Sequence, residues 1–258
     1  MKILRFATNR TIKYGVLEDD RIRVMLGTPY SYFRKSSGSL RLAESAYKLN
    51  EVRLLAPCLP SKIVALGLNY RSHAEETKLQ IPSMPLIFLK PSTAVIGPED
   101  NIVYPEVSKR VDYEGEMAVV IGRKAKAVDK AKAKEYILGY TCLNDVSARY
   151  EQRDDGQWTR AKSYDTFAPI GPCIETDISP DNLKLETYLN GELRQSTRTS
   201  DLIFPVDVLV SFISNIMTLL PGDVIATGTP SGIGPMKPGD VVEVRIEGIG
   251  TLRNYVVA

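Results

Sequence analysis

Few of the residues that build common cofactor sites occur in this chain of 258 residues. It has one histidine, His73, which excludes a metal site made of several histidines. The three cysteines (Cys58, Cys142 and Cys173) are far apart and form no Cys-x-x-Cys pair, which argues against a thiolate zinc site and suits a reducing cytoplasm. There is no strand–GxGxxG–helix unit either, so no dinucleotide site is predicted.

Charge and hydropathy argue against two further classes of partner. The net charge is +2 and no basic stripe is present, so nucleic-acid binding has no electrostatic support. No apolar run is long enough to cross a bilayer, and the first six residues lack the apolar core of a signal peptide. We therefore expect a cytoplasmic globular protein that binds neither nucleic acid nor membranes.

The order of the predicted elements indicates a β-rich α+β fold in two parts. Residues 1–56 are predicted as a small N-terminal β-rich domain, with a turn at 8–10, a loop at 36–39 and a short helix at 40–49. Residues 57–258 are predicted as the main domain. It contains many short strands, a hairpin turn at Asn190-Gly191 and one long amphipathic helix over 204–220. Few helices among many strands argue against a doubly wound sheet.

The stretch from Arg110 to Gly122, RVDYEGEMAVVIG, is predicted as one strand because it ends in an apolar, β-branched run. Side chains alternate along a strand, so Asp112, Glu114 and Glu116 share one face. Like charges this close repel one another unless a cation lies between them, and oxygen ligands favour Mg²⁺, Mn²⁺ or Ca²⁺. A solvated acidic edge is the simpler alternative.

Asp145 is a further candidate ligand because it lies where the next predicted strand ends. Its simpler interpretation is a cap for the following helix. His73 and Glu76 lie three residues apart on a short predicted helix, so the carboxylate can hold the imidazole as a general base. An exposed histidine on a solvated helix is the alternative.

Three more sites carry groups suited to binding anions. Arg149 and Gln152 share a helical face, Lys162 lies in a predicted polar loop, and Gly228-Thr229 offers backbone amides and a hydroxyl. Each of these features on its own is ordinary for a protein surface or a turn.

Taken together, five sequence blocks resemble the fumarylacetoacetate hydrolase family over roughly residues 60–257. The blocks are GLNYRSHAEE (67–76), DYEGE (112–116), NDVSAR (144–149), KSYDT (162–166) and TGTPSG (227–232). The resemblance implies the family's mixed β-sandwich roll, a homodimer and a Mg²⁺ or Mn²⁺ site.

The same resemblance assigns a role to each candidate residue. It implies that the metal ligands are Glu114, Glu116 and Asp145. It implies that His73 with Glu76 activates water or moves a proton, on a lid that orders over the substrate. It implies that Lys162 stabilises developing negative charge. The implied substrate contacts are Arg149, Gln152 and Thr229.

One departure from the family pattern affects the expected substrate. The namesake hydrolases carry a further aspartate ligand where this chain has IVALG (63–67). The chain is therefore similar to the shorter branch of acylpyruvate hydrolases, oxaloacetate decarboxylases and hydroxyheptadienedioate isomerases. We expect a metal-dependent enzyme acting on a 2-oxo acid or its enol, with hydrolysis of the C–C bond of an acylpyruvate-type diketone as the leading reaction. The alternatives are isomerisation, decarboxylation, or a non-catalytic metal-binding or ligand-binding protein on the same scaffold.

Overall fold

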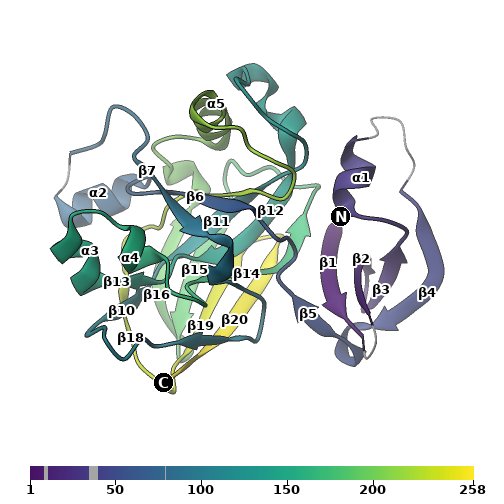
Figure 1. The fold of residues 1–258 in the computed structure, drawn as a ribbon, viewed down its shortest axis with the longest axis horizontal. Helices are drawn as coiled ribbons and strands as arrows, with labels where there is room; N and C mark the ends of the chain where they lie inside the picture. Colours follow the sequence, from purple (N-terminus) through teal and green to yellow (C-terminus); the bar gives the residue numbers. More distant parts are fainter. Residues whose placement is uncertain (9–10, 35–39, 79) are drawn as a thin grey trace.

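The structure is a computed structural model that describes residues 1–8, 11–34, 40–78 and 80–258 (Figure 1). The predicted loop at 36–39 and most of the predicted turn at 8–10 lie outside the described residues. No described helix is both long and apolar enough to cross a membrane. The α-helices of the described residues are α1 (Pro29–Arg34), α2 (Arg71–Thr77), α3 (Arg149–Asp155), α4 (Thr159–Lys162) and α5 (Val206–Ile216).

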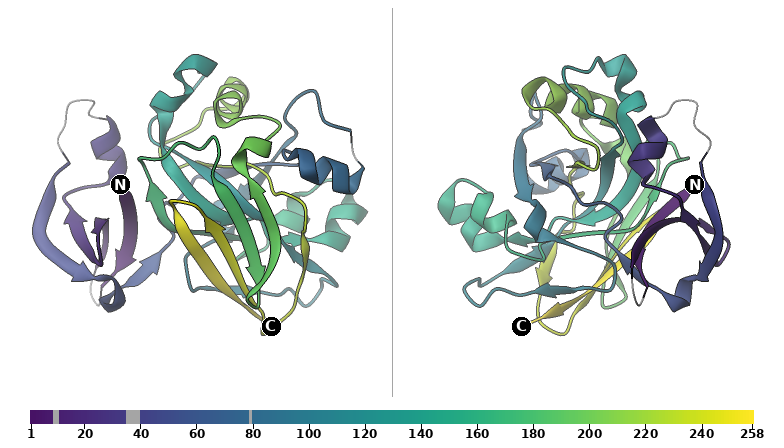
Figure 2. Two further views of the ribbon diagram at one scale, coloured as in Figure 1. Left: turned by 180° about the vertical axis from the view of Figure 1, so that it is seen from behind. Right: turned by 45° about the vertical axis from the view of Figure 1, so that its right-hand side comes forward.

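The N-terminal strands lie to one side of the rest of the chain (Figures 1 and 2). They are β1 (Lys2–Ala7), β2 (Ile12–Glu18), β3 (Arg21–Met25), β4 (Leu42–Lys48) and β5 (Arg53–Leu55). The predicted helix at 40–49 is wrong, because most of this segment forms β4 along the edge of β3. Tyr47 of β4 then packs edge-on against Phe6, and this tertiary contact overrides local helix propensity.

The main sheet continues from the N-terminal strands in the order β4-β3-β2-β1-β14-β12-β11-β17-β6-β7, with β5 on β1 and β8 on β14. Its other strands are β6 (Lys62–Leu66), β7 (Ile87–Pro91), β8 (Val95–Ile96), β11 (Gly115–Ile121), β12 (Ile137–Asn144), β14 (Ala168–Glu175) and β17 (Val224–Ala226). Because β1 pairs with β14, one ladder crosses the predicted boundary at residue 56. The division into two domains at that residue stays a prediction.

Two smaller sheets complete the β structure of the described residues. One contains β16 (Glu192–Arg198), β15 (Lys184–Leu189), β19 (Val241–Ile246), β20 (Gly250–Val257) and β9 (Asn101–Val103), and the other contains β13 (Ser147–Ala148), β10 (Val111–Tyr113) and β18 (Gly234–Met236). The hairpin at Asn190-Gly191 is confirmed, and both residues have the positive φ that this turn requires (53° and 80°).

The core lies on both faces of the main sheet, and β11 runs through its middle. Met117 and Val119 of β11 face a cluster shared with the five-stranded sheet and α5, while Ala118 and Val120 face a second cluster on the opposite side. A strand buried on both faces needs a continuous apolar run, which explains its sequence. The predicted β-rich α+β class is confirmed.

Candidate active site

The predicted strand over 110–122 is two strands, β10 and β11, which belong to different sheets and meet at Glu114. Side-chain oxygens accept hydrogen bonds from the backbone N–H groups at this break. The Glu114 N–H donates to Asn144 Oδ1 (2.9 Å), and the Gly115 N–H donates to Gln195 Oε1 (3.0 Å). Gly115 is required here, because a Cβ atom would lie 2.0 Å from Thr187 Oγ1. The expectation of a single strand is therefore wrong at its centre.

The break still leaves three of the four candidate acids together. Carboxylate oxygens of Glu114, Glu116 and Asp145 lie within 4.8 Å of one another, and all three side chains are buried. Asp145 directly follows β12, and its N–H donates to the Glu114 carbonyl (2.8 Å). The structure thus brings the predicted ligand trio into one cluster. Asp112 is not part of it.

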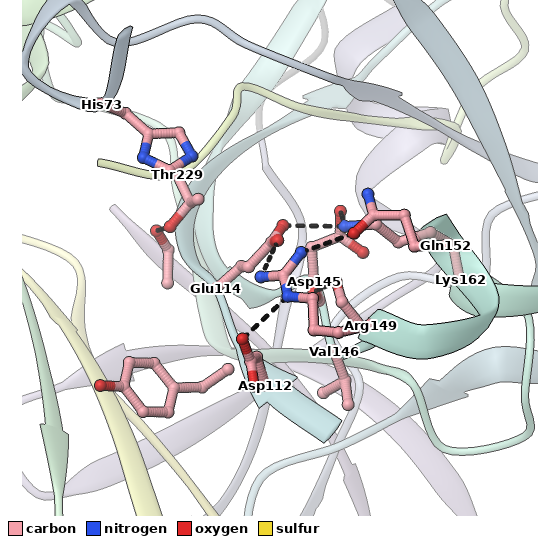
Figure 3. Close-up of polar contacts among 12 residues, drawn as sticks. His73, Asp112, Glu114, Asp145, Val146, Arg149, Gln152, Lys162 and Thr229 are labelled. Atoms are coloured by element: carbon pink, nitrogen blue, oxygen red, sulfur yellow. Dashed lines mark hydrogen bonds and ion pairs between the residues drawn. The ribbon is translucent and has the colours of Figure 1, made fainter. Parts of the chain in front are cut away.

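Two buried lysines contact this acidic cluster, and Figure 3 shows one of them, Lys162. Lys162 Nζ donates to Glu114 Oε2 (2.8 Å) and to Asp145 Oδ2 (2.7 Å). It lies on α4, so the expected loop is wrong. Lys90, at the end of β7, lies with its Nζ 2.5 Å from Asp145 Oδ1 and donates to the Val146 carbonyl (3.2 Å). Sequence reasoning missed Lys90, which directly follows a stretch, 86–89, that the sequence predicts as a buried strand.

Arg149 joins the cluster to Asp112. Its Nη2 lies 2.5 Å from Glu114 Oε1, its Nε donates to Asp112 Oδ2 (2.8 Å), and its Nη1 donates to Gln152 Oε1 (2.8 Å). Arg110 also binds Asp112 through two hydrogen bonds, of 2.8 and 3.1 Å. Two arginines thus neutralise Asp112, which explains why it does not join the metal-type cluster.

The charges in this cluster shift several pKa values. Burial works against ionisation of Glu114, but Lys162 and Arg149 outweigh it and lower the pKa to about 2. Burial, together with the carboxylates of Asp145 and Glu114, raises the pKa of Glu116 well above its usual value. Burial also lowers the pKa of Lys90, although Asp145 opposes this shift. Without a further cation, the surroundings of Glu116 therefore favour its protonated form.

The donor set fits a hard divalent cation. Glu116 Oε2 accepts from the Gly228 N–H (2.8 Å), whereas Glu116 Oε1 is buried and has no hydrogen-bond partner among the described residues. Oxygens already bonded to lysine still have a second lone pair, so Glu114 and Asp145 can bind a metal as well. Such all-oxygen ligands suit Mg²⁺, Mn²⁺ or Ca²⁺ better than softer metals.

His73 and Glu76 lie on α2, as predicted, and their side chains pair. His73 Nδ1 lies 3.1 Å from Glu76 Oε2, and Glu76 Oε1 accepts from the Gly232 N–H (3.2 Å). The ring is largely buried, so the alternative of an exposed histidine is wrong. Figure 3 shows His73 outside the network that joins Lys162, Arg149 and the labelled acids.

Thr229 has internal partners. Its hydroxyl donates to the Gly115 carbonyl (3.0 Å) and accepts from Gln195 Nε2 (2.8 Å). Gln195 is a second residue that sequence reasoning missed. It is buried on β16, whose other residues are exposed or only partly buried, and nothing in its local sequence marked it. Whether Thr229 contacts a substrate stays a prediction.

Comparison with known proteins shows the family of the chain. Residues 62–257 match the family described as "Fumarylacetoacetate (FAA) hydrolase C-terminal", and residues 1–57 match "Rv2993c-like, N-terminal". The chain therefore belongs to the fumarylacetoacetate hydrolase family, in which members are enzymes acting on small molecules.

Three relatives illustrate the range of activities in the family. The chain is 46% identical to the structure of 5-carboxymethyl-2-hydroxymuconate delta-isomerase from Mycobacterium smegmatis (TM-score 0.92, covering 100% of this chain and 99% of that one). It is 36% identical to fumarylacetoacetate hydrolase from psychrophilic Exiguobacterium antarcticum (TM-score 0.90, covering 100% and 99%). It is 41% identical to mitochondrial oxaloacetate tautomerase Fahd2a of Rattus norvegicus, covering 81% of this chain and 70% of the relative.

Proposed function

We propose that this chain is a divalent-metal-dependent enzyme that moves a proton on a 2-oxo acid or its enol, as a tautomerase or isomerase. The observation that carries the proposal is the buried carboxylate trio with its unpartnered Glu116 oxygen. Glu114, Glu116 and Asp145 would hold Mg²⁺ or Mn²⁺. When bound, this ion supplies a Lewis acid for the substrate's 2-oxo group.

The lysine and arginine side chains around the carboxylates determine which ligand charge this site prefers. Lys90, Lys162, Arg149 and Arg110 together balance the three carboxylates and Asp112, so a bound divalent ion leaves the site with excess positive charge. Such a site favours an anionic substrate and stabilises the negative charge of an enolate. Lys162 is the group we assign to that stabilisation, because it is already fixed between two acids.

His73 is the group we assign to proton transfer. Glu76 holds its Nδ1, which fixes the tautomer and leaves Nε2 to accept or donate a proton. Gln152 uses its Oε1 for Arg149, which leaves its amide NH₂ for a substrate oxygen. Arg149 and Thr229 complete the proposed substrate contacts, in addition to their internal hydrogen bonds.

Hydrolysis of a C–C bond is the second candidate. The match to a fumarylacetoacetate hydrolase supports it, and His73 would then take its proton from water. Two closer relatives, named as an isomerase and a tautomerase, favour proton transfer as the first candidate. Decarboxylation would involve the same enolate, and a non-catalytic binding protein is the alternative outside enzymes.

The test is a substrate panel of oxaloacetate, a 2-hydroxydienedioate and an acylpyruvate, each assayed with Mg²⁺ and with chelator. We expect keto–enol conversion or isomerisation that depends on the metal and is lost in Glu116→Gln. Cleavage of the acylpyruvate without any accelerated keto–enol conversion would replace the proposal with the hydrolase. If the chain turns over no member of the panel, a binding protein is the better description.

A further inference from the structure

One loop, residues 227–234, contacts both halves of the candidate site. At its start the Gly228 N–H donates to Glu116 Oε2 (2.8 Å), so the loop holds one member of the carboxylate trio. Near its end the Gly232 N–H donates to Glu76 Oε1 (3.2 Å), so the same loop holds the partner of His73. The position of this loop therefore sets the position of the proposed base relative to the acidic cluster.

Strand β16 lies behind this loop, and Gln195 connects the two. Gln195 Nε2 donates to Thr229 Oγ1 (2.8 Å) and to the Pro230 carbonyl (2.9 Å). Its Oε1 accepts from the N–H of Gly115, at the break in the acidic strand (3.0 Å). One buried amide thus joins the loop to the segment that carries Glu114 and Glu116.

Packing at Gly232 supports the same connection. A Cβ atom on Gly232 would lie 2.2 Å from the carbonyl oxygen of Arg194, the neighbour of Gln195, so the loop rests directly on the β16 backbone. Gly232 also has a φ of +92°, which few other residues adopt. The Tyr113 hydroxyl donates to the Gly232 carbonyl (2.9 Å) and fixes the peptide from another side.

We infer that Gln195 is a positioning residue: it fastens the 227–234 loop to the acidic strand, so that His73–Glu76 and the carboxylate trio keep one fixed arrangement. Its consequence for catalysis rests on the proposed function. The expected effect of Gln195 on α2 does not rest on the proposed function, because it follows from the hydrogen bond between Glu76 and Gly232.

The test compares variants on both sides of this connection. Gln195→Met keeps the length of the side chain and removes all three hydrogen bonds. Thr229→Val removes the hydrogen bonds that the Thr229 hydroxyl makes with Gln195 and with the Gly115 carbonyl, but it keeps the bond from Gln195 to the Pro230 carbonyl and leaves the Gly115 N–H its acceptor. Thr229→Ser keeps the hydroxyl. Ser196→Ala, at an exposed position on the same strand, is the matched control.

Hydrogen exchange without substrate is the deciding measurement, with α5 as the internal reference. We expect exchange in α2 to rise about tenfold in Gln195→Met and by a smaller factor in Thr229→Val, which keeps the bond to the Pro230 carbonyl. Exchange in α5, and in α2 of Ser196→Ala and Thr229→Ser, should stay close to wild type. Unchanged α2 exchange in either disruptive variant, or an equal rise in α5, would overturn the inference. If Gln195→Met does not fold, the exchange of α2 in Thr229→Val alone decides the inference.

Turnover adds an independent readout. If the proposed function holds, kcat of Gln195→Met falls by about tenfold and KM changes less, because the arrangement of reacting groups is disturbed more than binding. If the wild-type protein turns over no 2-oxo acid, the proposed function is wrong. The hydrogen-exchange result then still decides the role of Gln195.

Discussion

Replacing Lys90 with methionine tests the electrostatics of the site most directly. Lys90 is fully buried, with its Nζ 2.5 Å from Asp145 Oδ1, and Met keeps its length without its charge. Removing one partner of a buried ion pair costs roughly 3–5 kcal/mol. Asp145 keeps Lys162 on its other oxygen, so we expect the lower end of that range, about 3 kcal/mol. For a chain of this size this corresponds to an unfolding temperature roughly 6–12 °C lower.

The assay is thermal unfolding at pH 7, once with chelator and once with Mg²⁺. A divalent cation at the trio replaces the missing charge, so Mg²⁺ should raise the unfolding temperature of Lys90→Met more than that of wild type. The matched control is Lys184→Met, which removes a half-exposed ion pair with Glu186 and should leave the unfolding temperature close to wild type. If Lys90→Met with chelator melts within about 2 °C of wild type, the ion pair is not the strong contact that its geometry indicates.

Three further predictions concern the metal and the base. Glu116→Gln should weaken Mg²⁺ binding by at least about tenfold in calorimetry, since it removes the negative charge of a carboxylate with an unpartnered oxygen; wild-type affinity would contradict the ligand assignment. His73→Ala should lower kcat by roughly a hundredfold or more, with Glu76→Gln losing less, and unchanged rates in both would exclude this base. Because burial and the neighbouring carboxylates raise the pKa of Glu116, Mg²⁺ binding at pH values below that pKa must release a proton, so Mg²⁺ affinity should rise with pH there by up to about tenfold per unit; a flat profile would count against the shift.

Local patterns predicted the elements whose structure is decided locally. The apolar run 117–121 is a strand buried on both faces, Asn190-Gly191 is a hairpin turn, and α5 lies within the predicted helix. Residues 40–49 were predicted wrongly because their structure depends on pairing with β3, which no local pattern reveals. The short helix predicted to carry His73 and Glu76 is present as α2.

The carboxylate trio was predictable because two of its members lie two residues apart on one chain segment and the third follows a strand. The break at Glu114 was not, because it depends on Asn144 and Gln195, which come from distant strands. Asp112 was predicted on the same face as the ligands, but it pairs with two arginines and lies outside the cluster. These partners come together only in the folded chain, so spacing alone could not separate Asp112 from the ligands.

The pairing of β1 with β14 has a consequence for self-association. On the side opposite β12, the backbone of β14 is covered by β1 near Ile174 and by β8 near Ala168. Ile3 and Ile174, which face each other in this ladder, are fully buried. Without β1, that stretch of β14 would present unpaired N–H and C=O groups beside an exposed isoleucine, which is a template for pairing with another chain. We therefore expect a chain shortened to begin at residue 57 to associate through β14, which sedimentation of the shortened and full-length chains would test; an unchanged oligomeric state would contradict this role of β1.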